Sequence, residues 1–302
     1  MRDRIDQIVT NLNKTIVGKA DPIRMVLVAL FSGGHALLED VPGVGKTLLA
    51  KSLARCIDGK FQRVQCTPDL LPSDVTGTNI WNPSSGEFQF MPGPVFANIL
   101  LTDEINRATP RTQSALLEVM EEHQVTLDGV SRRVPEPFFV IATQNPVEYQ
   151  GTFPLPEAQM DRFALSFSLG YPNEDEELRM LANLADPVKP DDLQPCITLD
   201  EMQALKKQCT QVRVEDSVQR YILALVRATR ETEEIALGVS PRGTVALYRA
   251  VQALAFLEGR EYAIPDDVKT LVPNVLAHRV IATSGHQAMA VMRHLLETVA
   301  IP

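Results

Sequence analysis

Short apolar runs alternate with longer segments of helical periodicity from the start of the chain to about residue 170. Five of these runs have the length and residue types of strands: His35–Glu39, Arg63–Cys66, Asn98–Thr102, Phe138–Thr143 and Ala164–Leu169. The third and fourth runs are apolar enough for both of their faces to be buried. Strands of this kind are typical of parallel sheets that have helices on both sides.

Around these strands lie segments whose apolar residues recur at the three- and four-residue spacing of a helix with one buried face. They are Pro22–Ser32, Lys46–Ile57, Arg111–Glu122 and Asn173–Leu184. The alternation predicts an α/β fold with a doubly wound, parallel, five-stranded sheet. In such sheets the ligand binds at the carboxyl ends of the strands.

The strand signal ends in a stretch rich in proline and charge, and only helical periodicity follows it. We predict an α/β domain over residues 1–185, a linker over 186–199 and a small all-α domain over 200–302. In the last of these, one predicted helix face carries Val218, Tyr221, Ile222, Leu225, Val226 and Thr229. Further helices are predicted at 245–255, 265–280 and 286–299.

Composition narrows the class of protein. The chain has 302 residues, a formal net charge of −9 and four cysteines without CxxC or zinc-site spacing. An acidic chain argues against broad binding to nucleic acid or anionic membranes, since both attract basic surfaces. The amino terminus lacks the apolar run of a signal peptide, and no apolar stretch approaches the ~18 residues of a membrane span. We therefore expect a cytoplasmic protein.

The segment between the first strand and the next helix has the composition of a phosphate-binding loop. Its glycines allow the backbone to turn N–H groups inward, and the following helix contributes its positive end. Lys46 is expected to reach the β- and γ-phosphates, and the Thr47 hydroxyl to bind Mg²⁺. The predicted nucleotide-binding set here is Gly43, Val44, Gly45, Lys46, Thr47 and Leu48. Asp40 departs from the strict pattern, which has glycine at that position.

Two acids follow the third strand. Asp103 is predicted to hold the Mg²⁺ shell, and Glu104 is the candidate base that polarises the attacking water. A strand capped by solvated carboxylates is the alternative when this pair is taken alone. Combined with the glycine-rich loop, the pair predicts hydrolysis of Mg·ATP.

Several motifs together resemble the MoxR-type AAA+ ATPases. They are Gly43–Thr47, Leu101–Arg107, Ala142–Pro146, Leu155–Phe163, Ser240–Gly243 and Pro265–Val268. The resemblance extends over essentially the whole chain. It implies an AAA+ core with a P-loop sheet, followed by a helical lid, with ATP and Mg²⁺ as ligands.

The resemblance also implies roles for single residues. Asn145 resembles the sensor-1 amide that contacts the γ-phosphate or the lytic water, and a turn-forming asparagine is the alternative. Arg162 resembles the arginine finger that reaches the γ-phosphate of the neighbouring subunit. Arg242 resembles sensor 2, which extends from the lid to the same phosphates in cis. Val17 and Gly18 resemble the segment that packs against adenine, with an ordinary turn as the alternative.

Two insertions complete the likeness. Residues 77–95 resemble the insert in the second helix of this branch of AAA+ proteins. Residues 124–134 predict a hairpin with its turn at Asp128-Gly129, which matches the hairpin before sensor 1. Four apolar side chains of the first insert could contact a client or seat the insert on its own domain: Trp81, Phe88, Phe90 and Met91.

By resemblance, we expect a chaperone-like motor that matures, assembles or loads metal into client protein complexes. A finger acting in trans implies a homo-oligomeric ring, expected to be hexameric, and the family often works with a von Willebrand factor A-domain protein. A nucleic-acid translocase and a metal-chelatase motor subunit remain alternatives. A non-hydrolysing scaffold is disfavoured, because it would need none of Glu104, Asn145 and Arg162.

Overall fold

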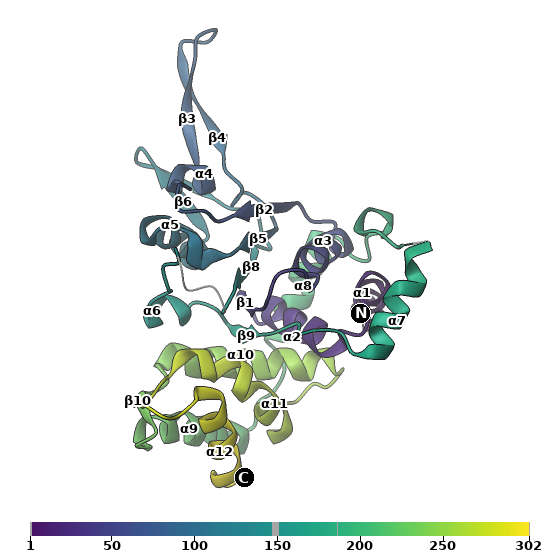
Figure 1. Cartoon of the computed structure of the whole chain (residues 1–302), viewed down its shortest axis with the longest axis vertical. Helices are drawn as coiled ribbons and strands as arrows, with labels where there is room; N and C mark the ends of the chain where they lie inside the picture. The colour runs from purple at the N-terminus through teal and green to yellow at the C-terminus, as the bar shows by residue number, and fades with distance from the viewer. Residues whose placement is uncertain (1, 147–150, 186, 302) are drawn as a thin grey trace.

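The computed structural model describes residues 2–146, 151–185 and 187–301, which form an α/β domain and a helical lid (Figure 1). The first residue of the predicted linker and the outer ends of both predicted domains, residues 1 and 302, lie outside the described part. None of the described helices is long and apolar enough to cross a membrane.

The central sheet has five parallel strands, as predicted. They are β1 (Ala36–Glu39), β2 (Phe61–Gln65), β5 (Ile99–Asp103), β8 (Phe139–Gln144) and β9 (Leu165–Phe167). The spatial order is β2-β5-β8-β1-β9, and every neighbouring pair is parallel. Because β8 lies between β1 and β5, the carboxyl ends of these three strands meet at one edge of the sheet.

Helices cover both faces of the sheet. One face packs against α1 (Arg2–Thr15), α2 (Ala20–Phe31) and α3 (Lys46–Cys56), and the other against α4 (Pro72–Thr76) and α5 (Pro110–Glu122). Alternate residues of each strand enter the two cores. Leu38, Leu101 and Ile141 face α1–α3, whereas Leu37, Leu100 and Val140 face α5, and all are fully buried. The strands are therefore buried on both sides, as the apolar runs predicted.

The amino-terminal helix α1 was not predicted, although its sequence carries the signal. Ile5, Ile8 and Leu12 follow helical spacing, and all three are buried against the α/β core. The polar and charged residues between them make the segment hydrophilic as a whole, which hides a narrow apolar stripe.

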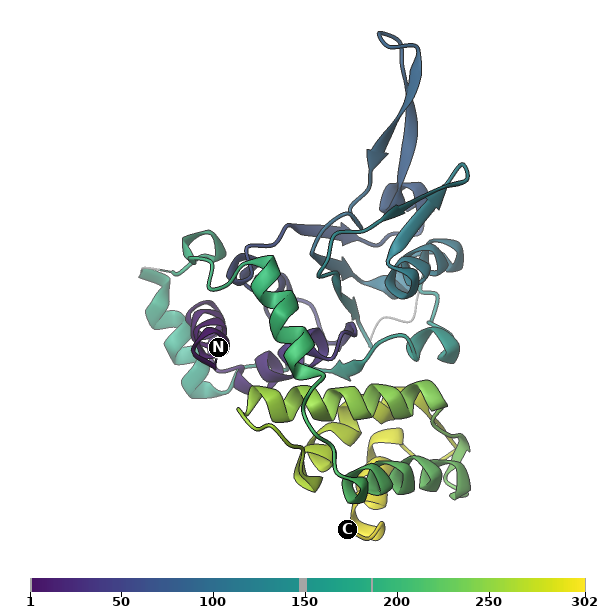
Figure 2. The same ribbon diagram turned by 180° about the vertical axis from the view of Figure 1, so that it is seen from behind.

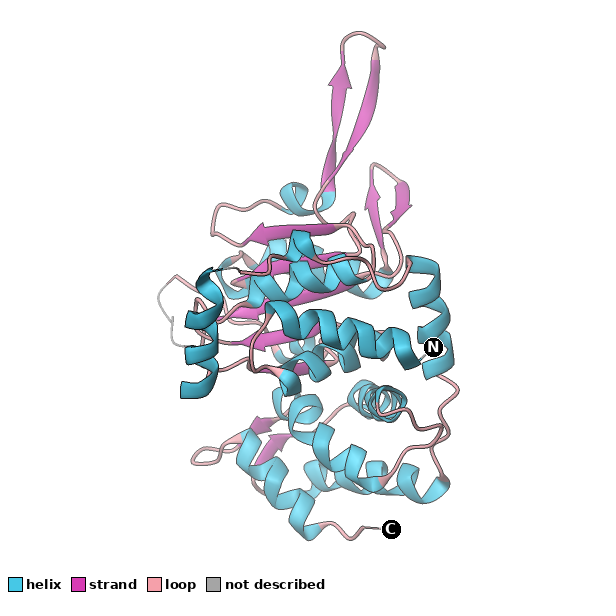
Figure 3. Ribbon diagram, turned by 90° about the vertical axis from the view of Figure 1, so that its right-hand side faces the viewer, coloured by secondary structure: helices cyan, strands magenta, loops and turns pink. Residues whose placement is uncertain are grey.

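Two hairpins project from the α/β domain (Figures 1 and 3). The longer one pairs β3 (Gly77–Asn82) with β4 (Glu87–Pro92), and the shorter one pairs β6 (Gln124–Leu127) with β7 (Val130–Arg133). In the shorter hairpin both turn residues have positive φ, 51° at Asp128 and 76° at Gly129. That geometry is the type I′ turn expected from an Asp-Gly pair.

The four apolar residues of the longer hairpin divide into two roles. Phe90 seats the hairpin, because its ring packs on Phe96 at 5.4 Å and lies 4.2 Å below the guanidinium of Arg132. Trp81, Phe88 and Met91 are 51%, 70% and 49% exposed. The rings of Trp81 and Phe88 contact each other across the hairpin. Phe90 therefore seats the insert on its own domain, and contact of the exposed residues with a client stays a prediction.

The predicted linker is pinned to the α/β domain. Arg55 on α3 donates from Nε to the carbonyl of Leu193 at 3.0 Å, and the amide of Cys196 donates to the carbonyl of Cys56 at 2.8 Å. Leu193 and Cys196 are themselves buried. The segment between the domains is thus anchored to α3 by main-chain contacts.

The carboxy-terminal part is a helical bundle. Its α-helices in the described chain are α8 (Leu199–Cys209), α9 (Asp216–Glu231), α10 (Pro241–Leu257), α11 (Pro265–Leu276) and α12 (Ala288–Thr298), whereas α6 (Glu157–Met160) and α7 (Glu174–Ala182) precede it in the α/β domain. The all-α prediction needs one correction, because β10 (Ile235–Leu237) and β11 (Ile281–Ala282) form a short antiparallel pair. Strands this short carry no readable period.

The lid docks directly on the α/β domain through α10, which lies along the base of that domain (Figure 2). The rings of Phe31 on α2 and Phe256 on α10 lie 5.7 Å apart. Buried residues of α2, β9, α10 and α11 belong to one continuous apolar cluster. The seam between the two parts is therefore an extension of the core.

Candidate functional site

The loop between β1 and α3 has the backbone geometry of an anion cradle. Gly43 and Gly45 have φ of 89° and 97°, a backbone region that residues with a side chain rarely adopt. Gly45 caps α3 without a side-chain bond, so the first-turn N–H groups of that helix keep their capacity for a ligand. A Cβ placed on either glycine would meet no atom within 4 Å, so the space beside the loop is open. This geometry fits phosphate groups.

The ends of β5 and β8 complete this cavity. It is lined by Pro42, Gly43, Gly45, Lys46, Thr47, Leu48, Arg63, Gln65, Asp103, Glu104, Thr143 and Asn145. Asp103 and Asn145 are each only 7% exposed, so their polar groups face the cavity from a largely buried position. The fold thus brings the predicted loop, both acids and the predicted sensor-1 residue to one place. Val44 lies within the loop between the two glycines.

A hydroxyl links the two acids. Thr143 on β8 donates from Oγ1 to Oδ1 of Asp103 at 3.2 Å. The Oγ1 atom of Thr143 also accepts from the amide of Glu104 at 2.9 Å. Glu104 itself has φ of 55°, a left-handed conformation that costs a non-glycine residue about 1 kcal/mol or more. The bond from its amide to Thr143 helps to hold Glu104 in this unfavourable backbone conformation, which is common among residues at functional sites.

Strand β2 contributes side chains that the sequence analysis did not identify. Arg63 donates from Nε to Oδ2 of Asp103 at 2.7 Å, and Gln65 donates from Nε2 to Oε2 of Glu104 at 3.0 Å. Arg107 donates to the same oxygen of Glu104 at 3.1 Å. Period-two alternation along β2 places Arg63 and Gln65 on one face, but only the pairing with β5 shows that this face meets the acids.

The oxygen donors in this cavity fit a magnesium ion. Carboxylate and hydroxyl oxygens are the ligands that Mg²⁺ prefers, and Asp103 and Thr47 supply one of each. The thiol of nearby Cys66 takes no part in ionised form. Burial, with a further contribution from Asp103, raises its pKa to about 12.

Asp40 has a structural role that accounts for the departure from the glycine pattern. Its carboxylate is buried and accepts from Ser168 Oγ at 2.6 Å, the Leu169 amide at 2.6 Å and the Gly170 amide at 3.1 Å. Its carbonyl accepts from Lys46 Nζ at 3.1 Å. Asp40 therefore ties the entrance of the phosphate loop to the segment that follows β9, a function that glycine cannot supply.

Asp40→Asn should lower the free energy of unfolding by roughly 1–3 kcal/mol, because an amide turns N–H groups toward donors that now bind a carboxylate. Thermal unfolding followed by circular dichroism measures the loss. Asp216→Asn is the matched control, since the Asp216 carboxylate is 76% exposed, and it should change the midpoint far less. Equal shifts in both variants would contradict the assigned role.

The predicted arginines lie in a second cavity, at the seam between the α/β domain and the lid. One carboxylate holds both of them, because Arg162 Nη2 lies 3.2 Å from Oε2 of Glu121 and Arg242 bonds to Oε1. We refer to Glu121, Arg162 and Arg242 as the arginine cluster. Asp161 and Arg279 also line this cavity, which shares no lining residue with the nucleotide cavity among the described residues.

Arg242 does not line the nucleotide cavity of its own chain among the described residues, and its cis role at the phosphates stays a prediction. The sequence analysis expected it to reach the phosphates of its own subunit, but in this structure it lies with Arg162 at Glu121. Arg242 is the second residue of α10, whose start is docked against Asp161 through Ser240. The docking of that helix directs Arg242 to the same cavity as Arg162.

The two residues predicted to pack against adenine lie in the turn between α1 and α2. Gly18 has φ of 74°, and a Cβ there would collide with the carboxyl group of Glu176 on α7. Neither Val17 nor Gly18 lines the nucleotide cavity among the described residues. Their assignment to adenine stays a prediction.

Comparisons with known proteins agree with this geometry. A family model for ATPases associated with various cellular activities (AAA) matches residues 35–165, and an AAA lid-domain model matches residues 227–295. Chaperone MoxR1 of Mycobacterium tuberculosis is 40% identical over 99% of this chain and 82% of its own length. The uncharacterized protein YeaC of Bacillus subtilis is 48% identical over 97% of this chain and 93% of its own.

Protein MoxR of Methylorubrum extorquens is 30% identical over 100% of this chain and 96% of its own length. A solved structure of a candidate ATPase from Cytophaga hutchinsonii superposes with a TM-score of 0.92, at 37% identity and covering 100% of this chain and 96% of that one. Fold, loop and lid together define a nucleotide-binding AAA+ enzyme that hydrolyses ATP. Within that class, the chain belongs to the MoxR family.

Proposed function

We propose that this protein hydrolyses Mg·ATP within a homo-oligomeric ring, expected to be hexameric, and uses that energy to remodel client protein complexes as a chaperone. The observation that carries the proposal is the separation of Arg162 and Arg242 from the nucleotide cavity of their own chain. Guanidinium groups in this separate cavity are proposed to serve hydrolysis of ATP that a neighbouring subunit supplies. The name of the mycobacterial relative, a chaperone, supports the client-directed part.

Within one subunit, the cavity residues divide the chemistry. The loop amides and Lys46 hold the phosphates. Glu104 takes the proton of the attacking water as its oxygen bonds to the γ-phosphorus, while the bond from that phosphorus to the β–γ bridging oxygen breaks and ADP leaves. Gln65 and Arg107 keep the Glu104 carboxylate oriented, and Asn145 completes the wall of the cavity. Magnesium held by Thr47 and Asp103 would neutralise charge on the phosphate oxygens.

Across the subunit interface, Arg162 is proposed to act as the finger on the neighbour's γ-phosphate. Because Glu121 holds Arg162 and Arg242 together, we propose that Arg242 also acts in trans, as an alternative to the cis role expected from the sequence. The developing negative charge of the transition state then meets two guanidiniums.

The exposed end of the β3–β4 hairpin is the proposed contact with a client. Trp81 and Phe88 form an exposed apolar pair one position from the end of this hairpin, which is the part of the molecule farthest from the lid (Figure 1), whereas the exposed Met91 lies near its base, opposite Thr78. A nucleic-acid translocase is less well supported, since the chain is acidic and Arg132 in the shorter hairpin is stacked on Phe90. A von Willebrand factor A-domain partner, metal insertion and a cytoplasmic location stay parts of the proposal.

Lys46→Ala should weaken ATP binding by roughly 100-fold, because a charge-assisted bond to phosphate is lost. Isothermal titration with ATP and magnesium measures the affinity, and phosphate release should fall to background. Lys51→Ala is the control on the same helix, where the side chain is exposed, and it should bind ATP normally. A wild-type protein that assembles, has its partners added and still releases no phosphate would refute the proposed function.

A further inference from the structure

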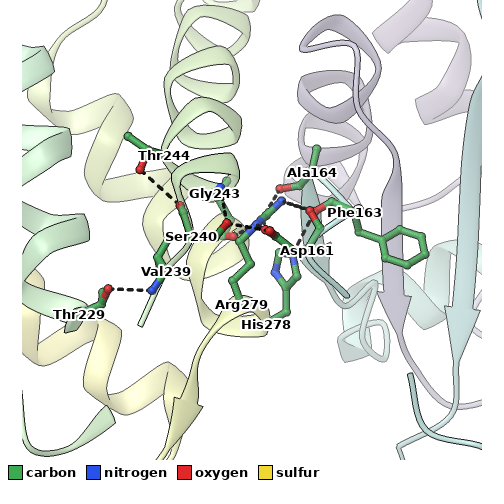
Figure 4. Close-up of polar contacts among 11 residues, drawn as sticks. Asp161, Phe163, Ala164, Thr229, Val239, Ser240, Gly243, Thr244, His278 and Arg279 are labelled. Atoms are coloured by element: carbon green, nitrogen blue, oxygen red, sulfur yellow. Dashed lines mark hydrogen bonds and ion pairs between the residues drawn. The ribbon is translucent and has the colours of Figure 1, made fainter. Parts of the chain in front are cut away.

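Hydrogen bonds among largely buried side chains join the α/β domain to the lid next to the arginine cluster, and Figure 4 shows this joint. At its centre is Arg279, whose side chain is only 2% exposed although it carries a charge. Arg279 follows α11 in the lid and extends into the segment 161–164 of the α/β domain, which carries Arg162. A buried charge persists only where it is paired and fully hydrogen-bonded, so this placement needs a specific partner set.

Arg279 bonds to the residues that come directly before and after Arg162 in the chain. Arg279 donates from Nε to Oδ1 of Asp161 at 2.8 Å and from Nη2 to the Asp161 carbonyl at 3.3 Å. It also donates from Nη2 to the carbonyl of Phe163 at 2.5 Å and from Nη1 to that of Ala164 at 3.1 Å. The backbone on both sides of Arg162 is therefore held by one lid side chain.

The same joint reaches Arg242 through Ser240. Ser240 donates from Oγ to Oδ2 of Asp161 at 2.7 Å and accepts from the Gly243 amide at 3.2 Å, which caps α10. Arg242 is the second residue of that helix. The two carboxylate oxygens of Asp161 thus bind two lid residues, Arg279 and Ser240, and each of these sets the position of one arginine of the cluster.

Gly243 shows that the joint is closely fitted. A Cβ at this position would lie 3.0 Å from Cδ of Arg279 and 2.5 Å from Cγ1 of Val239. Both distances are shorter than side chains tolerate without movement. The glycine that ends the Ser240–Gly243 motif therefore leaves the passage through which Arg279 reaches Asp161.

We propose that Arg279 is a positioning residue which, through Asp161 and Ser240, joins Arg162 and Arg242 to the lid as one rigid unit. Movement of the lid then carries both arginines toward or away from the ATP of the neighbouring subunit. The lid of one subunit thereby controls hydrolysis in the next. This inference rests on the proposed trans action of the two arginines, and it adds the device that regulates it.

The first test replaces Arg279 by lysine, which keeps the charge but cannot reproduce the forked set of bonds. Misplacing the finger by about 1 Å should lower kcat by roughly 10- to 100-fold, with KM within about twofold of wild type. Arg260→Lys is the matched control, since Arg260 forms a forked pair with Asp267 inside the lid and bonds to no residue of the joint. It should leave kcat unchanged.

A double-mutant cycle separates positioning from general support of the fold. In a protein that already carries Arg162→Ala and Arg242→Ala, Arg279→Lys should change kcat by less than about twofold, because its effect acts through the missing arginines. Losses that multiply would overturn the inference. Mixing gives a second readout. Arg279→Lys subunits should regain turnover when Glu104→Gln subunits, whose arginines are intact, stand beside them.

Ser240→Ala serves where Arg279→Lys fails to fold, since it removes one hydroxyl only. Thr198→Ala is its control, because the Thr198 hydroxyl also caps a helix, by accepting from the Glu201 amide at 3.2 Å, but touches no residue of the joint. Ser240→Ala should lower kcat several-fold more than Thr198→Ala. If the wild-type enzyme hydrolyses ATP and both Ser240→Ala and folded Arg279→Lys are equally active, the positioning role of Arg279 is refuted. The proposed function would then still stand.

Discussion

Arg162→Ala should lower kcat by roughly 10³- to 10⁵-fold while ATP binds with unchanged affinity. The guanidinium is proposed to meet charge that develops only in the transition state of the neighbouring site, so ground-state binding does not depend on it. Steady-state phosphate release gives kcat, and titration with ATP gives the affinity.

The control for this variant is Arg111→Ala, which removes an exposed arginine from the start of α5 and should hydrolyse ATP normally. Surface arginines of that kind contribute only about 0–1 kcal/mol through ion pairs. Mixing Arg162→Ala with Glu104→Gln subunits should restore part of the turnover, because each variant retains what the other lacks. Normal turnover by Arg162→Ala alone would exclude action in trans.

Glu104→Gln should lower kcat by roughly 10²- to 10⁴-fold and retain ATP binding, since the amide has the shape of the carboxylate but accepts no proton. Single-turnover phosphate release measures the chemical step directly. Glu118→Gln, on the exposed side of α5, is the control and should leave the rate unchanged. Rapid hydrolysis by Glu104→Gln would assign the base to another residue.

The residues that the sequence analysis found are those whose chemistry is local in the chain. The phosphate loop needs a strand, two glycines and a helix start in one short segment, and all of these lie between β1 and α3. Glu104 follows a strand whose apolar character is visible in three consecutive residues, Ile99–Leu101. The type I′ turn at Asp128-Gly129 is likewise encoded by the two residues that form it.

The contacts that the sequence analysis did not identify join segments that are distant in the chain. Gln65 holds Glu104 only because β2 lies beside β5 in the sheet. Asp40 departs from the glycine pattern in the sequence, and its structural role depends on three donors from the segment after β9. Arg242 was predicted from its motif, but the motif cannot say on which side of the α/β domain the lid is docked.

The sequence by itself determined the class of the fold and the composition of the phosphate site, because periodicity, turn chemistry and loop motifs act over a few neighbouring residues. The tertiary structure decided the strand order, which places β8 between β1 and β5, and the docking of α10, which brings Arg242 to Glu121 rather than to Lys46. Both follow from burial of apolar surface across the whole chain. That burial depends on how complete faces fit together, and no local pattern encodes it.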